Sequence, residues 1–187
     1  MITIYTLGHA NRSFEELVSM LQLAAVKTLV DVRQHPQSVR HPHFDQESLR
    51  VALDGVGIEY HWAGRQLGGH RQSRANSLHT ALMDEGLRGF ADYMDGEVFK
   101  KGVAQLLNLA NRASTVMLCA EAEPLQCHRS LIADYLALQG IEVIHLVAPG
   151  QQRQHALHAG VRRESQQLVY DRFTTVELGF DEEGDST

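Results

Sequence analysis

Cysteine is nearly absent from this chain, which has only Cys119 and Cys127 among its 187 residues. Two cysteines cannot build the disulfide framework that holds small secreted domains together. Proline is also scarce, at four residues, and 43% of the residues are hydrophobic. This composition excludes a disordered chain and supplies enough apolar side chains for the core of one globular domain.

Long hydrophobic runs are missing as well. No segment approaches the roughly 18 to 20 consecutive apolar residues that a membrane-spanning helix requires, so we expect no membrane partner. The first residues, MITIYTLGHANRS, have a strand pattern followed by polar residues. They lack the basic start and the small-residue cleavage site of a signal peptide, and the sequence therefore predicts a cytoplasmic protein.

Lysine is rare: only Lys27, Lys100 and Lys101 occur among 17 basic residues, and the rest are arginine. The formal net charge of −6 argues against indiscriminate nucleic-acid binding through bulk charge. The planar guanidinium group nevertheless suits bidentate recognition of phosphate or carboxylate. The arginines are therefore still compatible with a local anion-binding site.

Five short runs rich in apolar and β-branched residues predict buried strands, at residues 2–7, 28–32, 58–62, 115–120 and 142–147. Their near-continuous hydrophobicity is typical of parallel strands covered on both faces. Helical patterns lie between them: one opens with the capping pair Ser13 and Glu16, and others span 46–53, 98–111 and about 129 to Gly140. This alternation predicts a single α/β domain over residues 1–150, with an open, mostly parallel sheet and flanking helices.

Two segments depart from this rhythm. Residues 64–89 are polar and arginine-rich, and they are predicted to form a long excursion or lid with a short helix. Residues 151–187 are predicted to be a C-terminal extension, whose last acidic residues we expect to be disordered.

Polar and charged residues follow four of the predicted strands, and the carboxyl ends of parallel strands are where open α/β sheets bind ligands. Two of these loops run into helix starts, whose free N–H groups favour an anion. The guanidinium groups of Arg12, Arg33 and Arg129 are expected to grip that anion together. The full set of predicted substrate-binding residues is Gly8, His9, Arg12, Arg33, Ser38, Arg65, Gly68, Gly69, Cys127, Arg129 and Ser130.

The predicted catalytic residues are Glu121, His128 and Asp31. Both carboxylates follow apolar strand residues, where partial burial would raise the pKa of the carboxyl group. Each could instead pair with a neighbouring arginine. Both interpretations stay open for Asp31, whereas for Glu121 we favour catalysis, with His128 as an assisting acid or base.

A metal site is not expected from the sequence. Cys119, Cys127 and His128 leave a tetrahedral zinc site one ligand short, and no C-x-x-C pair is present. Three further histidines form a loose cluster that fits no metal motif: His35, His41 and His43. We therefore predict no metal and no cofactor. Cys119 itself is either a small core residue or a thiol activated beside a helix start.

Several short motifs resemble the "domain of unknown function 488" family over residues 2–148. They are TLGH at 6–9, NRS at 11–13, DVR at 31–33 with Pro36 and Ser38, LGG at 67–69, FADYM at 90–94, and CAE at 119–121 with Pro124 and CHRS at 127–130. The resemblance implies a bacterial-type cytosolic α/β protein with these motifs around a shared site, and it implies no reaction. Ala10 stands where such sequences often carry serine. A weaker similarity runs to rhodanese-like domains, in which a strand-end cysteine is followed by Arg-Ser at a helix start, although the loop here is longer.

Three functions follow as hypotheses. The leading one is an enzyme that hydrolyses or transfers a group on an anionic small molecule, with a nucleotide or nucleic-acid component favoured. The second is a non-catalytic module that binds a nucleotide, or nucleic acid through Arg65, Arg71 and Arg74. The third is a thiol enzyme that uses Cys119. The substrate and the oligomeric state are not determined by the sequence.

Overall fold

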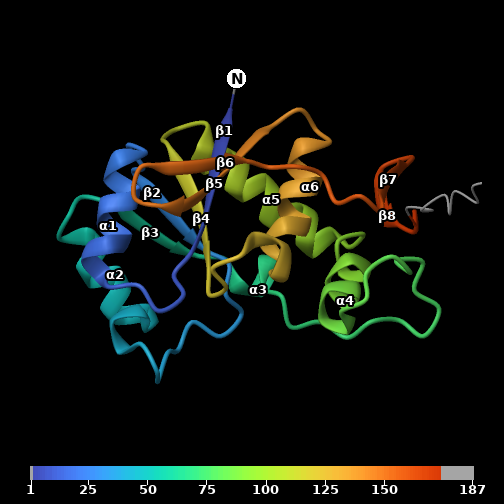
Figure 1. Ribbon diagram of the computed structural model, residues 1–187, viewed down its shortest axis with the longest axis horizontal. Coiled ribbons are helices and arrows are strands. Elements are labelled where there is room, and N and C mark those ends of the chain that lie inside the picture. Colours follow the sequence, from blue (N-terminus) through green and yellow to red (C-terminus); the bar gives the residue numbers. More distant parts are fainter. Residues whose placement is uncertain (1, 174–187) are drawn as a thin grey trace, which may run out of the picture.

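The protein folds as a mixed α/β domain built on a six-stranded sheet (Figure 1), in a computed structural model that describes residues 2–173. The strand order is β3-β2-β4-β1-β5-β6. Five strands run parallel: β1 (Thr3–Gly8), β2 (Thr28–Asp31), β3 (Glu59–Trp62), β4 (Thr115–Cys119) and β5 (Glu142–Ala148). The five predicted strands and their parallel arrangement are confirmed.

Helices cover both faces of the sheet, as the continuous apolar strands predict. They are α1 (Phe14–Leu23), α2 (Gln46–Asp54), α3 (Gly64–Leu67), α4 (Glu85–Tyr93), α5 (Glu97–Ala110) and α6 (Arg129–Ala137). Alternate residues of β4 enter two separate cores. Val116 and Leu118 pack with α1 and α2, while Met117 and Cys119 pack with α4, α5 and α6. The side chain of Cys119 therefore points into the layer that contains α6.

Local signals explain the helix boundaries. The Ser13 side chain accepts a hydrogen bond from the Glu16 backbone N–H at 3.1 Å and starts α1, as expected of an N-cap. After α6, Gly140 has a φ of +81°, the left-handed conformation that glycine adopts without strain. The expected helix start and helix end are both confirmed.

Three strands beyond residue 150 were not expected from the sequence. β6 (Gln151–Gln154) pairs antiparallel with β5 and extends the main sheet, while β7 (Val161–Glu164) and β8 (Gln167–Tyr170) form a separate two-stranded sheet. The sheet thus continues across the predicted boundary at residue 150. The acidic end of the predicted extension lies outside the described residues.

Two further expectations need adjustment. The strand β3 was predicted to be buried, but it lies at the sheet edge, and its four residues are partly or fully exposed. The predicted excursion at residues 64–89 contains α3 and the first part of α4, joined by residues 68–84, which include neither helix nor strand. Over residues 2–173, no helix combines the length and the apolar character that crossing a membrane requires.

Candidate functional site

The carboxyl ends of β1 and β4 lie side by side, with Gly8 paired to Cys119. The chain stays in register beyond the strands, because the backbone N–H groups of His9 and Ala10 donate to the carbonyls of Cys119 and Ala120 at 2.9 and 2.8 Å. A Cβ atom on Gly8 would lie 1.7 Å from the carbonyl oxygen of Glu121. Only glycine at this position allows the loop after β4 to fold over the end of β1.

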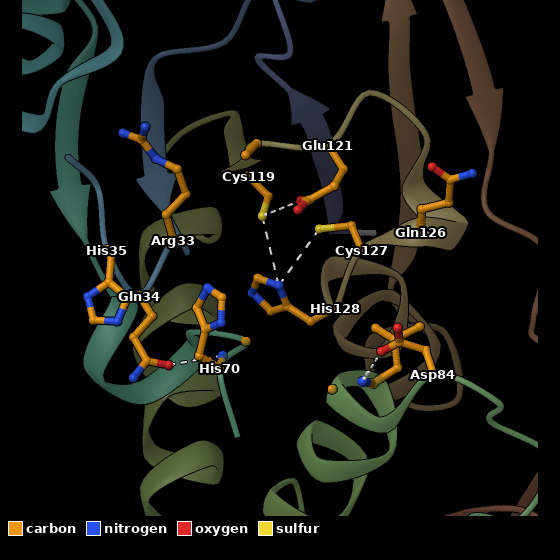
Figure 2. A pocket seen from close by; sticks show the side chains of 14 residues that line it. Arg33, Gln34, His35, His70, Asp84, Cys119, Glu121, Gln126, Cys127 and His128 are labelled. Atoms are coloured by element: carbon orange, nitrogen blue, oxygen red, sulfur yellow. Dashed lines mark hydrogen bonds between the residues drawn. The ribbon is translucent and has the colours of Figure 1, made fainter. Parts of the chain in front are cut away.

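Two thiols and an imidazole meet at the end of β4 (Figure 2). The 3₁₀ turn Pro124–Gln126 brings the chain back, so that Cys127 and His128 face Cys119 at the start of α6. Nδ1 of His128 lies 3.8 Å from Sγ of Cys119 and 3.7 Å from Sγ of Cys127. All three side chains are buried.

The second nitrogen of His128 fixes the direction of the ring. Nε2 lies 3.2 Å from the backbone carbonyl oxygen of Val32. Because a carbonyl only accepts hydrogen bonds, Nε2 carries the proton of the neutral ring. The lone pair of Nδ1 is therefore directed at the two sulfur atoms, as a base or a metal ligand would be.

Glu121 is the exposed member of this cluster. The Cys119 thiol donates to its Oε2 at 3.3 Å. Burial acts to raise the pKa of Glu121, but hydrogen bonds from its own backbone N–H and from the thiols of Cys127 and Cys119 outweigh burial, and the pKa is lowered overall. The expectation of a raised pKa was therefore wrong, and Glu121 is an ionised carboxylate at neutral pH. Burial also acts to raise the pKa of the Cys127 thiol, and there it prevails, so that this pKa is raised overall.

A cavity of about 350 Å³ opens beside this cluster at the carboxyl edge of the sheet. Polar or charged side chains make up more than half of its lining residues, and Leu87 is the only large aliphatic side chain among them. The remaining lining residues are Arg33, Gln34, His35, Gly69, His70, Asp84, Gly86, Cys119, Ala120, Glu121, Gln126, Cys127 and His128. The cavity thus combines the loops after β2 and β4 with residues of the predicted excursion.

Sequence reasoning missed several members of this wall: Gln34, His70, Asp84 and Gln126 were not candidates, and His35 was considered only for a metal. Gln34 ties two loops together, because its Oε1 accepts from the backbone N–H of His70 at 3.0 Å. The rings of His35 and His70 lie 5.5 Å apart and are exposed. The only signal in the sequence was their place in loops after strands.

The guanidinium group of Arg33 is occupied by the protein itself. Its Nε and Nη2 donate to the two carboxylate oxygens of Asp31 at 2.9 and 2.6 Å, and Nη1 donates to the carbonyl of Phe44 at 2.9 Å. Asp31 is fully buried and also accepts from the hydroxyl of Tyr60 at 2.7 Å. Of the two interpretations of Asp31, the geometry supports the structural one, and Asp31 is not part of the cavity wall.

The two other arginines also hold the loops. Arg129 is buried and donates to the carbonyls of Glu121 and Ala122 at 2.6 and 3.0 Å. Arg12 donates to the carbonyls of Gly8 and Val147 and pairs with Glu16. Neither arginine lines the cavity. The three guanidinium groups stand around one rim, but they bind carbonyl and carboxylate groups of this chain.

Some of the remaining predicted residues line neighbouring hollows, and others pack within the protein. His9 and Ser38 line a second hollow of about 440 Å³, which shares Ala120 and Glu121 with the cavity. Arg65 lines a third hollow of about 460 Å³, which shares Gln34 and His35. Two others pack tightly: a Cβ on Gly68 would lie 2.3 Å from the carbonyl of Gly64, and the Ser130 hydroxyl donates to the carbonyl of Cys127 at 2.9 Å.

Comparison with known proteins gives one match. The family described as "Domain of unknown function DUF488" matches residues 13–136, more than half of the chain and the part that holds both sides of the cavity. No curated protein matches, and no solved structure matches.

Proposed function

Because the chain belongs to the DUF488 family, a domain family whose description assigns no reaction, we propose a function from the site itself. The protein is an enzyme that hydrolyses or transfers a group on a phosphate-bearing or otherwise anionic small molecule. Glu121 is its reacting carboxylate, and a nucleotide or nucleic-acid component is the favoured substrate. One observation carries the proposal: an exposed, ionised carboxylate stands beside a buried thiol–imidazole cluster, in a cavity at the carboxyl edge of a mostly parallel sheet.

The state of Glu121 favours particular chemical roles. A carboxylate that is already ionised is a poor proton donor, so it suits attack as a nucleophile or stabilisation of positive charge in an oxocarbenium-like transition state. Cys119 donates to Oε2, and His128 in turn contacts Cys119. His128 therefore acts through Cys119, as a residue that positions Glu121.

The cavity wall supports a polar, anionic substrate. The exposed imidazoles of His35 and His70 are among the lining residues of the cavity, and they attract an anion when protonated. The hollow that shares His35 adds Arg65, Arg71 and the partly exposed indole of Trp62. Arg71 donates to the carbonyls of Gly68 and Arg65, so a substrate that extends from Glu121 into this hollow would place a phosphate near Arg65 and a planar base near the indole. That combination supports a nucleotide component.

The test uses Glu121→Gln, with Glu123→Gln as the matched control. Glu123 lies in the same loop, pairs with Arg153 at 2.7 Å and does not line the cavity. A thermal-shift screen of nucleotides, nucleosides and phosphosugars selects ligands, and chromatography of long incubations detects turnover. We expect Glu121→Gln to keep the ligand-induced shift and to lose turnover by roughly 100-fold or more, while Glu123→Gln keeps both.

Two outcomes would decide against this proposal. Full turnover by Glu121→Gln would remove the carboxylate from the reaction. Ligand-induced stabilisation of the wild-type protein without turnover of any ligand would favour the non-catalytic binding module instead.

One contact favours a second candidate, a thiol enzyme. Sγ of Cys119 lies 3.8 Å from Nδ1 of His128, an arrangement in which the imidazole could accept the thiol proton. The burial of Cys119, which is 4% exposed, weighs against it, because an electrophile must reach the sulfur. This candidate requires Cys119 to react with iodoacetamide faster than a free thiol does, and it predicts that Cys127→Ser keeps activity.

A further inference from the structure

We propose that Cys119, Cys127 and His128 bind a zinc-class divalent metal ion, with the fourth coordination position open to the cavity. The inference stands on the arrangement of the three donor atoms, independently of the reaction proposed for Glu121. Both sulfur atoms and Nδ1 of His128 lie within 4.8 Å of one another (Figure 2). Over residues 2–173 they form the one such group of metal-ligating side chains.

The separations fit a tetrahedral ion. With Zn–S and Zn–N bonds of about 2.3 and 2.05 Å, tetrahedral geometry places a sulfur and a nitrogen ligand about 3.6 Å apart. The two S···N distances here are 3.8 and 3.7 Å. Both S···N distances are therefore within a few tenths of an ångström of the tetrahedral value, and the two sulfur atoms, which such an ion holds about 3.8 Å apart, lie within 4.8 Å of each other.

The hydrogen bond on the far side of His128 supports the same role. Metal-ligating histidines donate their other ring N–H to a carbonyl or carboxylate, which fixes the ring and the tautomer. Nε2 of His128 has this partner in the carbonyl of Val32 at 3.2 Å. The two sulfur ligands also come from rigid elements, because Cys119 ends β4 and Cys127 is anchored at the start of α6 by Ser130.

Without a metal, the two thiols have separate acceptors: the Cys119 thiol donates to Oε2 of Glu121, and the Cys127 thiol lies beside the single lone pair of Nδ1. One cation bound by both thiolates and the imidazole gives all three atoms a partner at once. The two thiolate charges also balance the divalent ion, so that the buried site is neutral. Thiolate sulfur selects zinc-class ions over Mg²⁺ or Ca²⁺.

The expectation of no metal rested on a missing fourth protein ligand. Three protein ligands and one open position are the donor set of a catalytic zinc, which holds water there, whereas structural zinc sites have four protein ligands. Here the cavity adjoins the three donors, and the Glu121 carboxylate lies 3.3 Å from Sγ of Cys119. Glu121 is thus placed to accept a hydrogen bond from a metal-bound water molecule. Binding releases the two thiol protons to the solvent.

The experiment measures metal binding directly, on full-length protein kept reduced with a phosphine. Purified protein is analysed for zinc by mass spectrometry, then stripped with a chelator and titrated with Zn²⁺ or Co²⁺ alone. We expect about one ion per chain. With Co²⁺ we also expect the intense visible bands of a tetrahedral ion and the near-ultraviolet bands of thiolate-to-cobalt charge transfer. Zn²⁺ should slow the reaction of both thiols with a disulfide reagent.

Substitutions distinguish metal binding from the reaction proposed for Glu121. Cys127→Ser and His128→Ala should weaken Zn²⁺ binding by more than roughly tenfold. His35→Ala, in the same cavity wall, should bind Zn²⁺ normally. Glu121→Gln should keep the ion and lose turnover, so failure of the metal site and failure of the proposed reaction give different results. Wild-type protein that binds neither ion, and whose thiols react equally fast with and without Zn²⁺, would overturn the inference even if a variant failed to fold.

Discussion

At the scale of single residues, the role of each strand-end arginine depends on which acceptors its guanidinium N–H groups bind. The sequence correctly indicated that Arg12, Arg33 and Arg129 would stand near the carboxyl edge of the sheet. It did not show that loop carbonyls and Asp31 accept their hydrogen bonds. Those acceptors come from positions far along the chain or from the backbone of irregular loops, and no periodicity or spacing reveals where a loop carbonyl points.

The first prediction concerns Arg129, which holds the loop that carries Glu121. Arg129→Met leaves the carbonyls of Glu121 and Ala122 without their charged donor inside the protein. We expect the free energy of unfolding to fall by about 2–3 kcal/mol in urea titrations. Arg112→Met, at an exposed position, should change it by less than about 0.5 kcal/mol. Equal effects of the two substitutions would show that Arg129 does not hold the loop.

The second prediction concerns Gly69, which packs against the imidazole of His128. A Cβ at Gly69 would lie 2.5 Å from Nδ1 of His128, whereas the nearest atom to a Cβ at Gly55 is 3.4 Å away. Gly69→Ala must displace either the loop or the ring, so it should cost about 1–3 kcal/mol of stability and weaken Zn²⁺ binding. Gly55→Ala should do neither. Normal Zn²⁺ affinity in Gly69→Ala would mean that the loop moves and the ring does not.

At the scale of elements, the strands that can be recognised from the sequence are those buried on both faces. The strands β1, β2, β4 and β5 lie between two helical layers, so their residues are apolar on both faces and easily recognised. By contrast, β6 has the sequence QQRQ and is exposed throughout. It exists because it pairs with β5, which the local sequence does not encode. The same holds for the site residues. Cys119 ends a recognisable strand and Glu121 follows it closely, whereas His70 and Asp84 come from residues 68–84, which include no regular element.

The third prediction concerns the start of α4, which forms one wall of the cavity. Oδ1 of Asp84 accepts from the backbone N–H of Leu87 at 2.8 Å and caps this helix. Asp84→Ala should lower the free energy of unfolding by about 1 kcal/mol, while Asp84→Asn, which keeps the accepting oxygen, should retain most of the stability. Urea titration at neutral pH distinguishes the two. Equal losses in both variants would mean that the charge of Asp84 matters more than its cap.

At the scale of the whole molecule, buried histidines connect segments that are far apart in the sequence. Nδ1 of His145 on β5 lies 2.6 Å from the hydroxyl of Thr6, and its Nε2 lies 2.9 Å from Nδ1 of His155. His155 contacts Asp134 on α6 at 2.8 Å, and Asp134 accepts from the hydroxyl of Tyr170 on β8 at 2.9 Å. The network ties the segment beyond residue 150 to the main sheet, and Figure 1 shows how far β7 and β8 stand from the sheet centre.

The last prediction follows from the protonation of two buried rings, His145 of this network and His9 at the end of β1. Burial, and for His145 the neighbouring His155, lowers the pKa of His9 and His145 from 6.5 to about 4. Between these values the unfolded chain binds protons that the folded protein does not bind, so stability is fully present above pH 6.5 and falls as the pH drops towards 4. Each histidine contributes up to about 3 kcal/mol to this loss. Between pH 6.5 and 5, ordinary carboxylates remain largely ionised, so this window isolates the histidines.

The measurement is a set of urea unfolding titrations at steps of pH between 7.5 and 5, with m-values compared to confirm a single transition. His145→Gln removes one titrating ring and should flatten the curve, whereas His43→Gln, at an exposed position, should leave its slope unchanged. A free energy of unfolding that is constant from pH 7 to 5 in the wild-type protein would mean that these imidazoles take up protons in the folded protein as readily as in the unfolded chain. In that case the hydrogen bond of His145 to Thr6 would have the ring as donor, and the network from β1 to β8 would carry a buried positive charge.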